Sequence, residues 1–274
     1  MSPAVTIFKD SDHLAMHAAD RITQAVQIAI RERGRAMLAL AGGSTPAKTY
    51  GLLSGQDRRS GIDWAHTYLF FGDERFVPAD DPSSNFAMVR RTLLAPASVP
   101  AGHAFPVPTH LPTAAAAAAE YAATLITTFG AGASHDPPRF DLVLLGLGED
   151  GHTASLFPKA TSLRVTDRWA VATPPGTLPP RVERITLTFP VLNAARAILF
   201  LVFGRNKADA LRDVLGGRSS REECPAAGVR PVDGTLTWLV DEAAAGRPAR
   251  SGPPPGAVRE SGEAAEAEDD GCTP

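Results

Sequence analysis

The sequence predicts one α/β domain, built on a mostly parallel sheet with helices on both faces. Runs rich in Val, Ile, Leu and Phe alternate with helical periods along residues 1–246, and such alternation is typical of parallel sheets. Residues 140–145 (FDLVLL) are almost wholly apolar, as in a strand that is buried on both faces. With 274 residues, of which 44% are hydrophobic, the chain is large enough to bury a core without a disulfide or a structural metal.

The first part of the chain is expected to form a strand, a helix, a strand, a second helix and a third strand. The first helix begins at Ser11 or Asp12 and ends near Gly34, a residue type that favours helix C-termini. An apolar residue recurs in it every four positions and forms one stripe: Leu14, Ala18, Ile22, Val26 and Ile30. Pro46 fits the first turn of the second helix, because its missing N–H has no partner there. The strands are expected at residues 4–8, 36–40 and 67–71.

A second group of elements is expected after residue 112. Residues 112–129 include six consecutive alanines, and alanine is the best helix former. Tyr121, Leu125 and Phe129 add an apolar face to this helix. A shorter helix is expected at about residues 206–215. The remaining strands are expected at residues 140–145, 184–189, 197–203 and 236–240.

The charges divide the chain into a neutral body and an acidic terminal segment. Residues 247–274 carry six acidic and three basic side chains, which leaves 24 of each sign in residues 1–246. A nucleic-acid-binding domain normally has a basic excess, so the body is not expected to bind nucleic acid. The terminal segment has five prolines, four glycines and no aromatic residue, and we expect it to be a disordered tail. An interaction segment is the alternative, because acidic tails serve that role in some proteins.

Other features of the sequence exclude several classes of protein. The two cysteines, Cys224 and Cys272, are too few for a disulfide framework or a four-cysteine zinc site. The longest strongly apolar run covers residues 197–203, which is far shorter than a membrane span. The N-terminal residues MSPAVTIFKD lack the basic and apolar regions of a secretion signal, so a cytoplasmic location is expected.

Polar, glycine-rich segments follow three of the expected strands, where open α/β sheets bind their ligands. The first is residues 42–46 (GGSTP), just before a helix. Successive backbone N–H groups, the helix dipole and the hydroxyls of Ser44 and Thr45 favour an anion such as phosphate. The alternative is a glycine turn in which one hydroxyl caps the helix. The segment has neither the Gly-Lys-Ser/Thr of a Walker loop nor the second glycine of a nucleophile elbow.

Residues 146–151 (GLGEDG) match the pattern G-x-G-x-x-G of dinucleotide-binding loops. That pattern requires a sustained helix, which Pro158 would interrupt, and the carboxylates of Glu149 and Asp150 would repel a pyrophosphate. We therefore exclude a nicotinamide cofactor. A carboxylate beside His152 would instead fix its tautomer and raise its basicity, as a general base requires. The alternative is a surface Asp-Gly turn with a solvated histidine.

Residues 72–75 (GDER) place Asp73 and Arg75 beside the same expected crevice. Arg75 is suited to stabilise an oxyanion or to hold a carboxylate, while a salt-bridged turn at the rim is the alternative. Two further cations are candidates: Arg184 opens an expected strand and Lys207 lies near a helix start. A lysine there opposes the helix dipole, so an anionic partner would explain it, although lysines at helix ends are common.

Taken together, these segments resemble the 6-phosphogluconolactonase family, in the superfamily that also contains the glucosamine-6-phosphate deaminases. The matching stretches are residues 38–53, 70–94, 140–158, 184–211 and 234–245, of which GEDGHTASLFP is highly specific. The resemblance implies a modified doubly wound sheet. It also implies hydrolysis of 6-phospho-D-glucono-1,5-lactone to 6-phospho-D-gluconate in the oxidative pentose phosphate pathway, with no metal and no cofactor.

The resemblance also implies roles for individual residues. His152 would activate water, Asp150 would orient His152, and Arg75 would stabilise negative charge on the carbonyl oxygen. Glu149 and Asp73 are further catalytic candidates, and Asn85 would order its loop. The residues expected at the substrate phosphate are Gly43, Ser44, Thr45, Arg184 and Lys207. The implied partner is the sugar-phosphate lactone, with no nucleic acid and no membrane, and the chain is expected to be a monomer or a small homo-oligomer.

Two other functions compete with the lactonase. The motif of the deaminases resembles DGH followed five positions later by a glutamate, but here that position is Phe157. Deaminases also carry a tyrosine where this chain has Arg75. A sugar-phosphate sensor of a transcription regulator would need a helix-turn-helix before the sensor domain, and the first expected strand begins at about residue 4. Both comparisons favour the lactonase.

Overall fold

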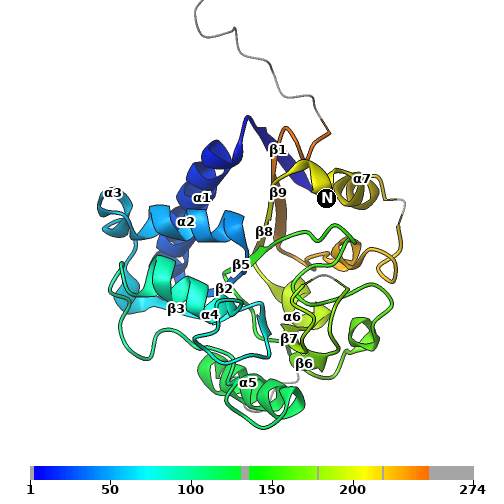
Figure 1. The fold of residues 1–274 in the computed structure, drawn as a ribbon. Coiled ribbons are helices and arrows are strands. Elements are labelled where there is room, and N and C mark those ends of the chain that lie inside the picture. The colour runs from blue at the N-terminus through cyan, green and yellow to red at the C-terminus, as the bar shows by residue number, and fades with distance from the viewer. Residues whose placement is uncertain (1–2, 131–135, 178, 218, 247–274) are drawn as a thin grey trace, which may run out of the picture.

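Six parallel strands form the central sheet of the computed structural model (Figure 1). Their order across the sheet is β1 (Ala4–Phe8), β9 (Thr235–Asp241), β8 (Ala197–Val202), β5 (Leu142–Leu145), β2 (Ala36–Leu40) and β3 (Thr67–Phe71). The structure describes residues 3–130, 136–177, 179–217 and 219–246, so the expected tail at residues 247–274 lies outside the described residues. All four residues of β5 are buried, as its apolar sequence predicts for a strand with both faces covered.

Helices cover both faces of this sheet, as predicted (Figure 1). α1 (Ser11–Arg33) and α2 (Ser44–Ser54) lie on one face, and α6 (Phe189–Ala194) and α7 (Ala208–Leu215) lie on the other. The remaining helices are α3 (Gln56–Arg59), α4 (Asn85–Val89) with a π-helical turn at Arg90–Leu94, and α5 (Ala114–Phe129). Short 3₁₀ turns occur at Trp64–His66, Thr161–Arg164, Arg205–Lys207 and Pro225–Gly228.

The first helix shows how closely the local sequence signals match the structure. The Asp10 carboxylate caps α1 by accepting from the N–H groups of Asp12 and His13, and Gly34 ends the helix at φ 75°. Four residues of the predicted stripe are buried: Leu14, Ala18, Ile22 and Val26. The fifth, Ile30, is partly buried and packs against the same core. The helical periodicity therefore predicts which face of α1 meets the sheet.

A second, three-stranded antiparallel sheet corrects the sequence prediction. It contains β4 (Asp73–Arg75), β7 (Arg184–Leu187) and β6 (Ala170–Thr173) in that order. The segment GDER was expected to be a loop, residues 184–189 were assigned to the parallel sheet, and β6 was not expected. The reason is physical: strands of three or four residues are too short to show an alternating pattern. Phe189, the last residue of the expected strand, begins α6 instead.

The order of the central sheet explains where a site forms. Parallel strands all point the same way, so the segments that follow neighbouring strands meet at one edge. β8, β5, β2 and β3 are neighbours, and the polar segments beginning at Gly204, Gly146, Gly42 and Gly72 follow them in turn.

Within the described residues, no helix combines the length and the apolar character that crossing a bilayer requires.

Gly51→Ala is expected to raise the free energy of unfolding by about 0.5–1 kcal/mol, because alanine lowers the entropy cost of forming a helix. Gly51 lies exposed inside α2, and an added Cβ would meet no atom within 4 Å. Urea unfolding of the two proteins measures the difference. A decrease in stability would show that this helix position is not free to take a side chain.

Candidate active site

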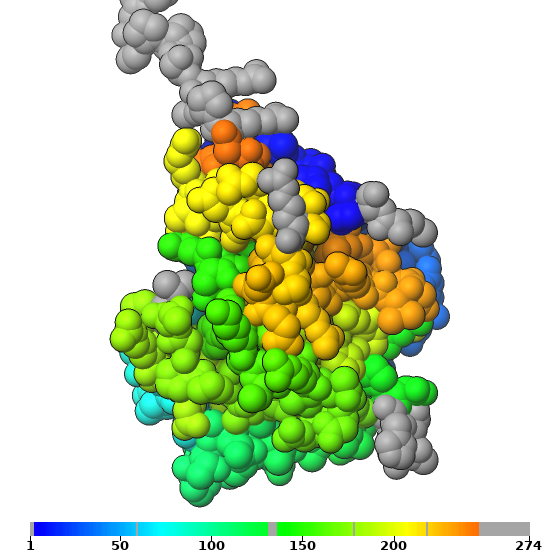
Figure 2. All heavy atoms as spheres, turned by 90° about the vertical axis from the view of Figure 1, so that its right-hand side faces the viewer, coloured from blue at the N-terminus to red at the C-terminus, as the bar shows by residue number. Residues whose placement is uncertain are grey.

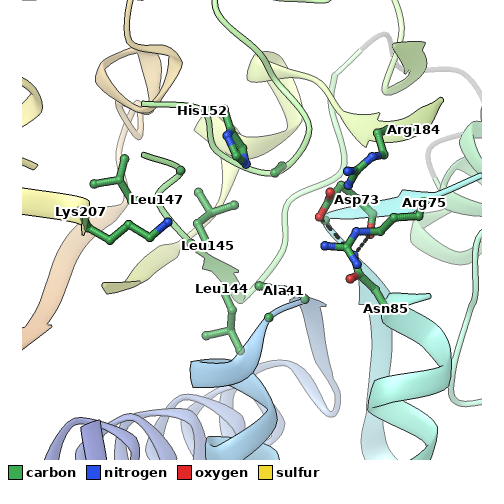
Figure 3. A pocket seen from close by; sticks show the side chains of 16 residues that line it. Ala41, Asp73, Arg75, Asn85, Leu144, Leu145, Leu147, His152, Arg184 and Lys207 are labelled. Atoms are coloured by element: carbon green, nitrogen blue, oxygen red, sulfur yellow. Dashed lines mark hydrogen bonds between the residues drawn. The ribbon is translucent and has the colours of Figure 1, made fainter. Parts of the chain in front are cut away.

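A cavity of about 240 Å³ opens at the edge of the central sheet where β2, β3 and β5 end (Figure 3). Six of the predicted catalytic and phosphate-binding residues line it: Gly43, Asp73, Arg75, His152, Arg184 and Lys207. They come from five separate segments of the chain, and the structure brings them together. Ser44, Thr45, Glu149 and Asp150 are not among the lining residues, although Ser44 follows Gly43, Glu149 follows Gly148 and Asp150 is hydrogen-bonded to His152.

His152 lines the cavity (Figure 3), and a carboxylate accepts a hydrogen bond from its ring. Its Nδ1 lies 2.5 Å from Oδ1 of Asp150, which also accepts the backbone N–H of His152. Because an ionised carboxylate only accepts, Nδ1 carries the proton and the free lone pair is on Nε2. The side chain of His152 is 22% exposed, so it is not the solvated surface histidine of the alternative.

The hydrogen bonds to His152 also change the pKa of the Asp150 carboxyl. Burial opposes its ionisation, but the hydrogen bonds and charge of His152 outweigh burial and hold the pKa of Asp150 below its ordinary value. Asp150 therefore stays ionised and can accept the hydrogen bond from Nδ1 of His152. This arrangement suits a general base that takes up a proton during a reaction.

Two glycines of the segment after β5, Gly148 and Gly151, are required by the close approach of other groups. A Cβ on Gly148 would lie 2.0 Å from Nδ1 of His152 and 2.6 Å from Oδ1 of Asp150. Gly151 has a φ of 80°, and a Cβ there would lie 2.4 Å from Sγ of Cys224. No α-helix follows this segment before Pro158 in the described residues, which agrees with the exclusion of a dinucleotide fingerprint.

The chain that follows α7 supports the histidine segment from outside. Figure 2 shows this face, where the yellow and orange C-terminal residues lie against the green segment after β5. Ala226 N–H donates to Gly151 O at 3.0 Å, and Lys159 N–H donates to Glu222 O at 2.8 Å. Cys224 is buried against Gly151, and burial raises the pKa of its thiol. No local sequence pattern predicts this support, because its contacts join segments about 70 residues apart.

Two arginines face the cavity from the small antiparallel sheet. Arg75 of β4 lies opposite Arg184 of β7, and Asp73 lies opposite Thr186. Side chains alternate along a strand, so Asp73 and Arg75 share a face, which Figure 3 shows beside the cavity. Burial, followed by the positive charge of Arg75, lowers the pKa of the Arg184 guanidinium.

Neither arginine is neutralised by a direct ion pair with a described residue. Arg184 is 6% exposed and donates to Pro180 O, and Arg75 donates to Ser83 O. The Nε atoms of both are buried without a hydrogen-bond partner. The expected alternative, a salt-bridged rim turn at Arg75, is therefore not what the described chain forms. Two adjacent guanidinium groups with unused donors favour an anionic or oxygen-rich ligand.

Glu74 orders this wall of the cavity, and sequence reasoning missed it. Its buried carboxylate accepts from the backbone N–H groups of Arg75, Asn85 and Phe86 and from the hydroxyl of Ser84. Burial raises the pKa of Glu74, and the three backbone donors oppose that rise. Because side chains alternate along β4, Glu74 points away from the cavity that Asp73 and Arg75 line.

The start of α2 lies at the cavity without a capping side chain. Gly43 precedes the helix at φ 106°, and neither Ser44 nor Thr45 caps it. The alternative in which one hydroxyl is an ordinary N-cap is therefore wrong. Asn85 packs against the same turn, because a Cβ on Gly42 would lie 1.9 Å from its Oδ1. The first N–H groups of α2 remain available for an anion.

Lys207 completes the positive lining from the opposite side (Figure 3). It ends the 3₁₀ turn Arg205–Lys207 after β8, and its Nζ lies 3.9 Å from Oε1 of Glu149. Oε1 of Glu149 also accepts from Nδ2 of Asn206 at 2.6 Å. Glu149, a catalytic candidate from the sequence, therefore lies beside Lys207 and outside the lining. Among the described residues, no group of three His, Cys, Asp or Glu side chains is arranged to hold a metal ion.

Comparison with known proteins agrees with this geometry. Residues 9–238 match the family described as glucosamine-6-phosphate isomerases/6-phosphogluconolactonase. The chain belongs to this family. A 6-phosphogluconolactonase from Synechocystis is 37% identical over 244 residues, which are 89% of this chain and 98% of that protein. One from Nostoc is 38% identical over 245 residues, again 89% of this chain and 98% of the relative.

Solved structures give the same assignment. The 6-phosphogluconolactonase from Trypanosoma cruzi aligns with a TM-score of 0.80 at 30% identity, over 90% of this chain and 97% of its own. The match covers both sheets of the described fold, because it extends over nearly the whole body of the chain. The predicted family and the predicted mostly parallel α/β fold are therefore confirmed.

Proposed function

We propose that this protein hydrolyses 6-phospho-D-glucono-1,5-lactone to 6-phospho-D-gluconate. One observation carries the proposal: His152, paired with Asp150, faces the same cavity as Arg75, Arg184 and Lys207. A base and several cations in one cavity suit attack of water on the carbonyl of an anionic ester. Curated relatives named 6-phosphogluconolactonase, such as that of Mycobacterium tuberculosis at 37% identity, support this choice of substrate.

In the proposed reaction, Nε2 of His152 removes a proton from water as the water oxygen attacks the lactone carbonyl. The carbonyl oxygen becomes negative, and Arg75 stabilises it. When the tetrahedral intermediate collapses, the bond to the ring oxygen breaks and His152 returns its proton to that oxygen. Asp150 stabilises the protonated His152 in between. General-base help of this kind is typically worth ~10²–10⁴-fold, and a lactone is reactive enough that no metal or cofactor is required.

The substrate phosphate is proposed to lie at the start of α2. Gly43, Ser44 and Thr45 offer backbone N–H groups and hydroxyls, and the helix dipole favours a negative charge there. Lys207 and Arg184 lie on either side of this helix start in Figure 3 and would pair with the phosphate oxygens. Anchoring the phosphate would position the lactone carbonyl below His152, which raises the rate of an otherwise bimolecular step.

Deamination of glucosamine 6-phosphate is a weaker candidate. The position that the deaminase motif gives to a glutamate is Phe157, whose ring lies 5.0 Å from that of His152. Phe157 is 9% exposed and cannot move a proton.

A phosphorylated sugar lactone is formed inside cells and does not cross a membrane unaided, so a cytoplasmic location belongs to the proposal. The proposal assigns catalysis to residues 1–246, acting as a monomer or a small homo-oligomer.

The direct test follows proton release from freshly generated lactone in a weakly buffered solution. We expect the rate to exceed the spontaneous rate and to rise in proportion to enzyme concentration. Ammonia release from glucosamine 6-phosphate, measured on the same preparation, should be absent. Calorimetric binding of the sugar phosphate without any acceleration of proton release would indicate a sensor and contradict the proposal.

A further inference from the structure

Asp73 has an unexpected place in a cavity that attracts anions. It is the one carboxylate among the described lining residues, and the same lining contains Arg75, Arg184 and Lys207. A carboxylate there repels the phosphate of the proposed substrate and weakens the cavity's positive potential. Such a group fits a ligand that also presents hydrogen-bond donors, because an ionised carboxylate only accepts.

The carboxylate of Asp73 is held in place by neutral groups and not by the neighbouring arginines. Its Oδ2 accepts from the hydroxyl of Ser155 at 2.5 Å. Nδ2 of Asn85 donates to the backbone oxygen of Asp73 at 2.9 Å and lies 3.4 Å from its Oδ1. No ion pair joins Asp73 to Arg75 or Arg184 in the described residues. Ser155 therefore sets the direction of this carboxylate, while Oδ1 retains capacity for a further donor.

Ser155 is itself fixed by the fold. It is fully buried and follows His152 by three residues, and its backbone N–H donates to Oγ1 of Thr186 at 3.2 Å. Thr186 lies opposite Asp73 in the pairing of β4 with β7. The hydroxyl of Ser155 thus joins the histidine segment to the small sheet, across 82 positions of sequence. Without that hydroxyl, Oδ2 of Asp73 loses its short hydrogen bond.

We propose that Ser155 is a positioning residue that holds Asp73 to accept a hydrogen bond from one ring hydroxyl of the substrate. Asp73, which is partly exposed here, then discriminates between hydroxylated and deoxygenated lactones, because an acceptor that a bound lactone shields from water and leaves without a donor is costly. This inference rests on the proposed function. It goes beyond it by assigning Asp73 to substrate specificity and Ser155 to the orientation of Asp73.

The test compares the full lactone with 6-phosphorylated lactones that lack the hydroxyl at C2, C3 or C4. For the wild-type enzyme, one deoxy lactone is expected to lower kcat/KM by about tenfold to a hundredfold, the range for one charge-assisted hydrogen bond. Asp73→Asn is expected to cause a similar loss on the full lactone, and Ser155→Ala a loss of about tenfold. Neither substitution should lower kcat/KM further on that deoxy lactone.

A double variant separates orientation from general stability. Because Ser155 acts through Asp73, Ser155→Ala combined with Asp73→Asn is expected to be no slower than Asp73→Asn alone. Ser162→Ala is the matched control, since it removes a buried hydroxyl that has no hydrogen-bond partner in the described structure. Its kinetic constants should equal those of the wild type on every lactone.

Several outcomes would overturn the inference. Equal losses for Ser155→Ala on the full and all deoxy lactones would indicate a structural role only. Multiplication of the two single losses in the double variant would show that Ser155 does not act through Asp73. Equal kcat/KM of the wild type on all four lactones would exclude a hydroxyl contact without any variant. Failure of the wild type to hydrolyse the full lactone would contradict the proposed function instead.

Discussion

His152→Ala is expected to lower kcat for the lactone by ~10²–10⁴-fold, the usual contribution of a general base. The imidazole of His152 lines the cavity, and its Nδ1 is hydrogen-bonded to the carboxylate of Asp150. No other described lining residue is an imidazole with such a carboxylate partner. KM should change little, because the groups proposed to hold the phosphate remain in place. Initial rates of proton release over a range of lactone concentrations measure both constants.

A matched histidine separates chemistry from general effects of the substitution. His66 is 57% exposed, pairs with Asp63 on the surface and does not line the cavity, so His66→Ala should retain full activity. Turnover close to the wild type in His152→Ala at saturating lactone would remove His152 from the mechanism. The cavity would then have to act through its cations alone, by stabilising charge on the carbonyl oxygen.

Much of the central architecture follows from local sequence patterns. The inner strands β2, β5 and β8 of the parallel sheet are apolar along their whole length, and the long helix α1 has a four-residue apolar repeat. Once these strands are predicted to be parallel, the segments after β2, β3 and β5 must meet at one edge of the sheet. That is why His152, Arg75 and the GGSTP turn could be assigned to one cavity before any coordinates were known.

The small sheet and its contacts could not be predicted in this way. A strand was expected at residues 184–189, but its antiparallel partners β4 and β6 were not, and β4 pairs with β7 over a separation of about 110 residues. Glu74 and Ser155 were missed for the same reason, since their partners are fixed by tertiary packing and not by a local period. The residues proposed to contact substrate carry recognisable chemistry in sequence, whereas those that orient them are ordinary serine and glutamate side chains.

The glycine motif shows how sequence and structure answer different questions. The pattern G-x-G-x-x-G after a strand predicts that the chain turns sharply there, but it does not say what the turn serves. The structure shows that Gly148 leaves space for a side chain of the same segment, namely His152. The same spacing that elsewhere admits a pyrophosphate here admits an imidazole and its carboxylate partner.

Gly148→Ala is therefore expected to reduce kcat by about 10²-fold or more, although it removes no chemical group. The added methyl would lie 2.0 Å from Nδ1 of His152 and 2.6 Å from Oδ1 of Asp150, so the pair must move. Gly148 does not have a positive φ, so alanine itself is tolerated by the backbone and the fold should persist. Circular dichroism and the thermal midpoint check the fold, and steady-state kinetics measure the loss.

Two comparisons make this prediction specific to the position of the imidazole. Gly51→Ala adds the same methyl at a site where no atom lies within 4 Å, and it should leave kcat unchanged. Gly148→Ala combined with His152→Ala should be no slower than His152→Ala alone, because displacing a base that is already absent has no further effect. If Gly148→Ala instead kept the wild-type kcat, the segment would have to relax without moving Nε2. The close approach of Gly148 would then not be what positions the base.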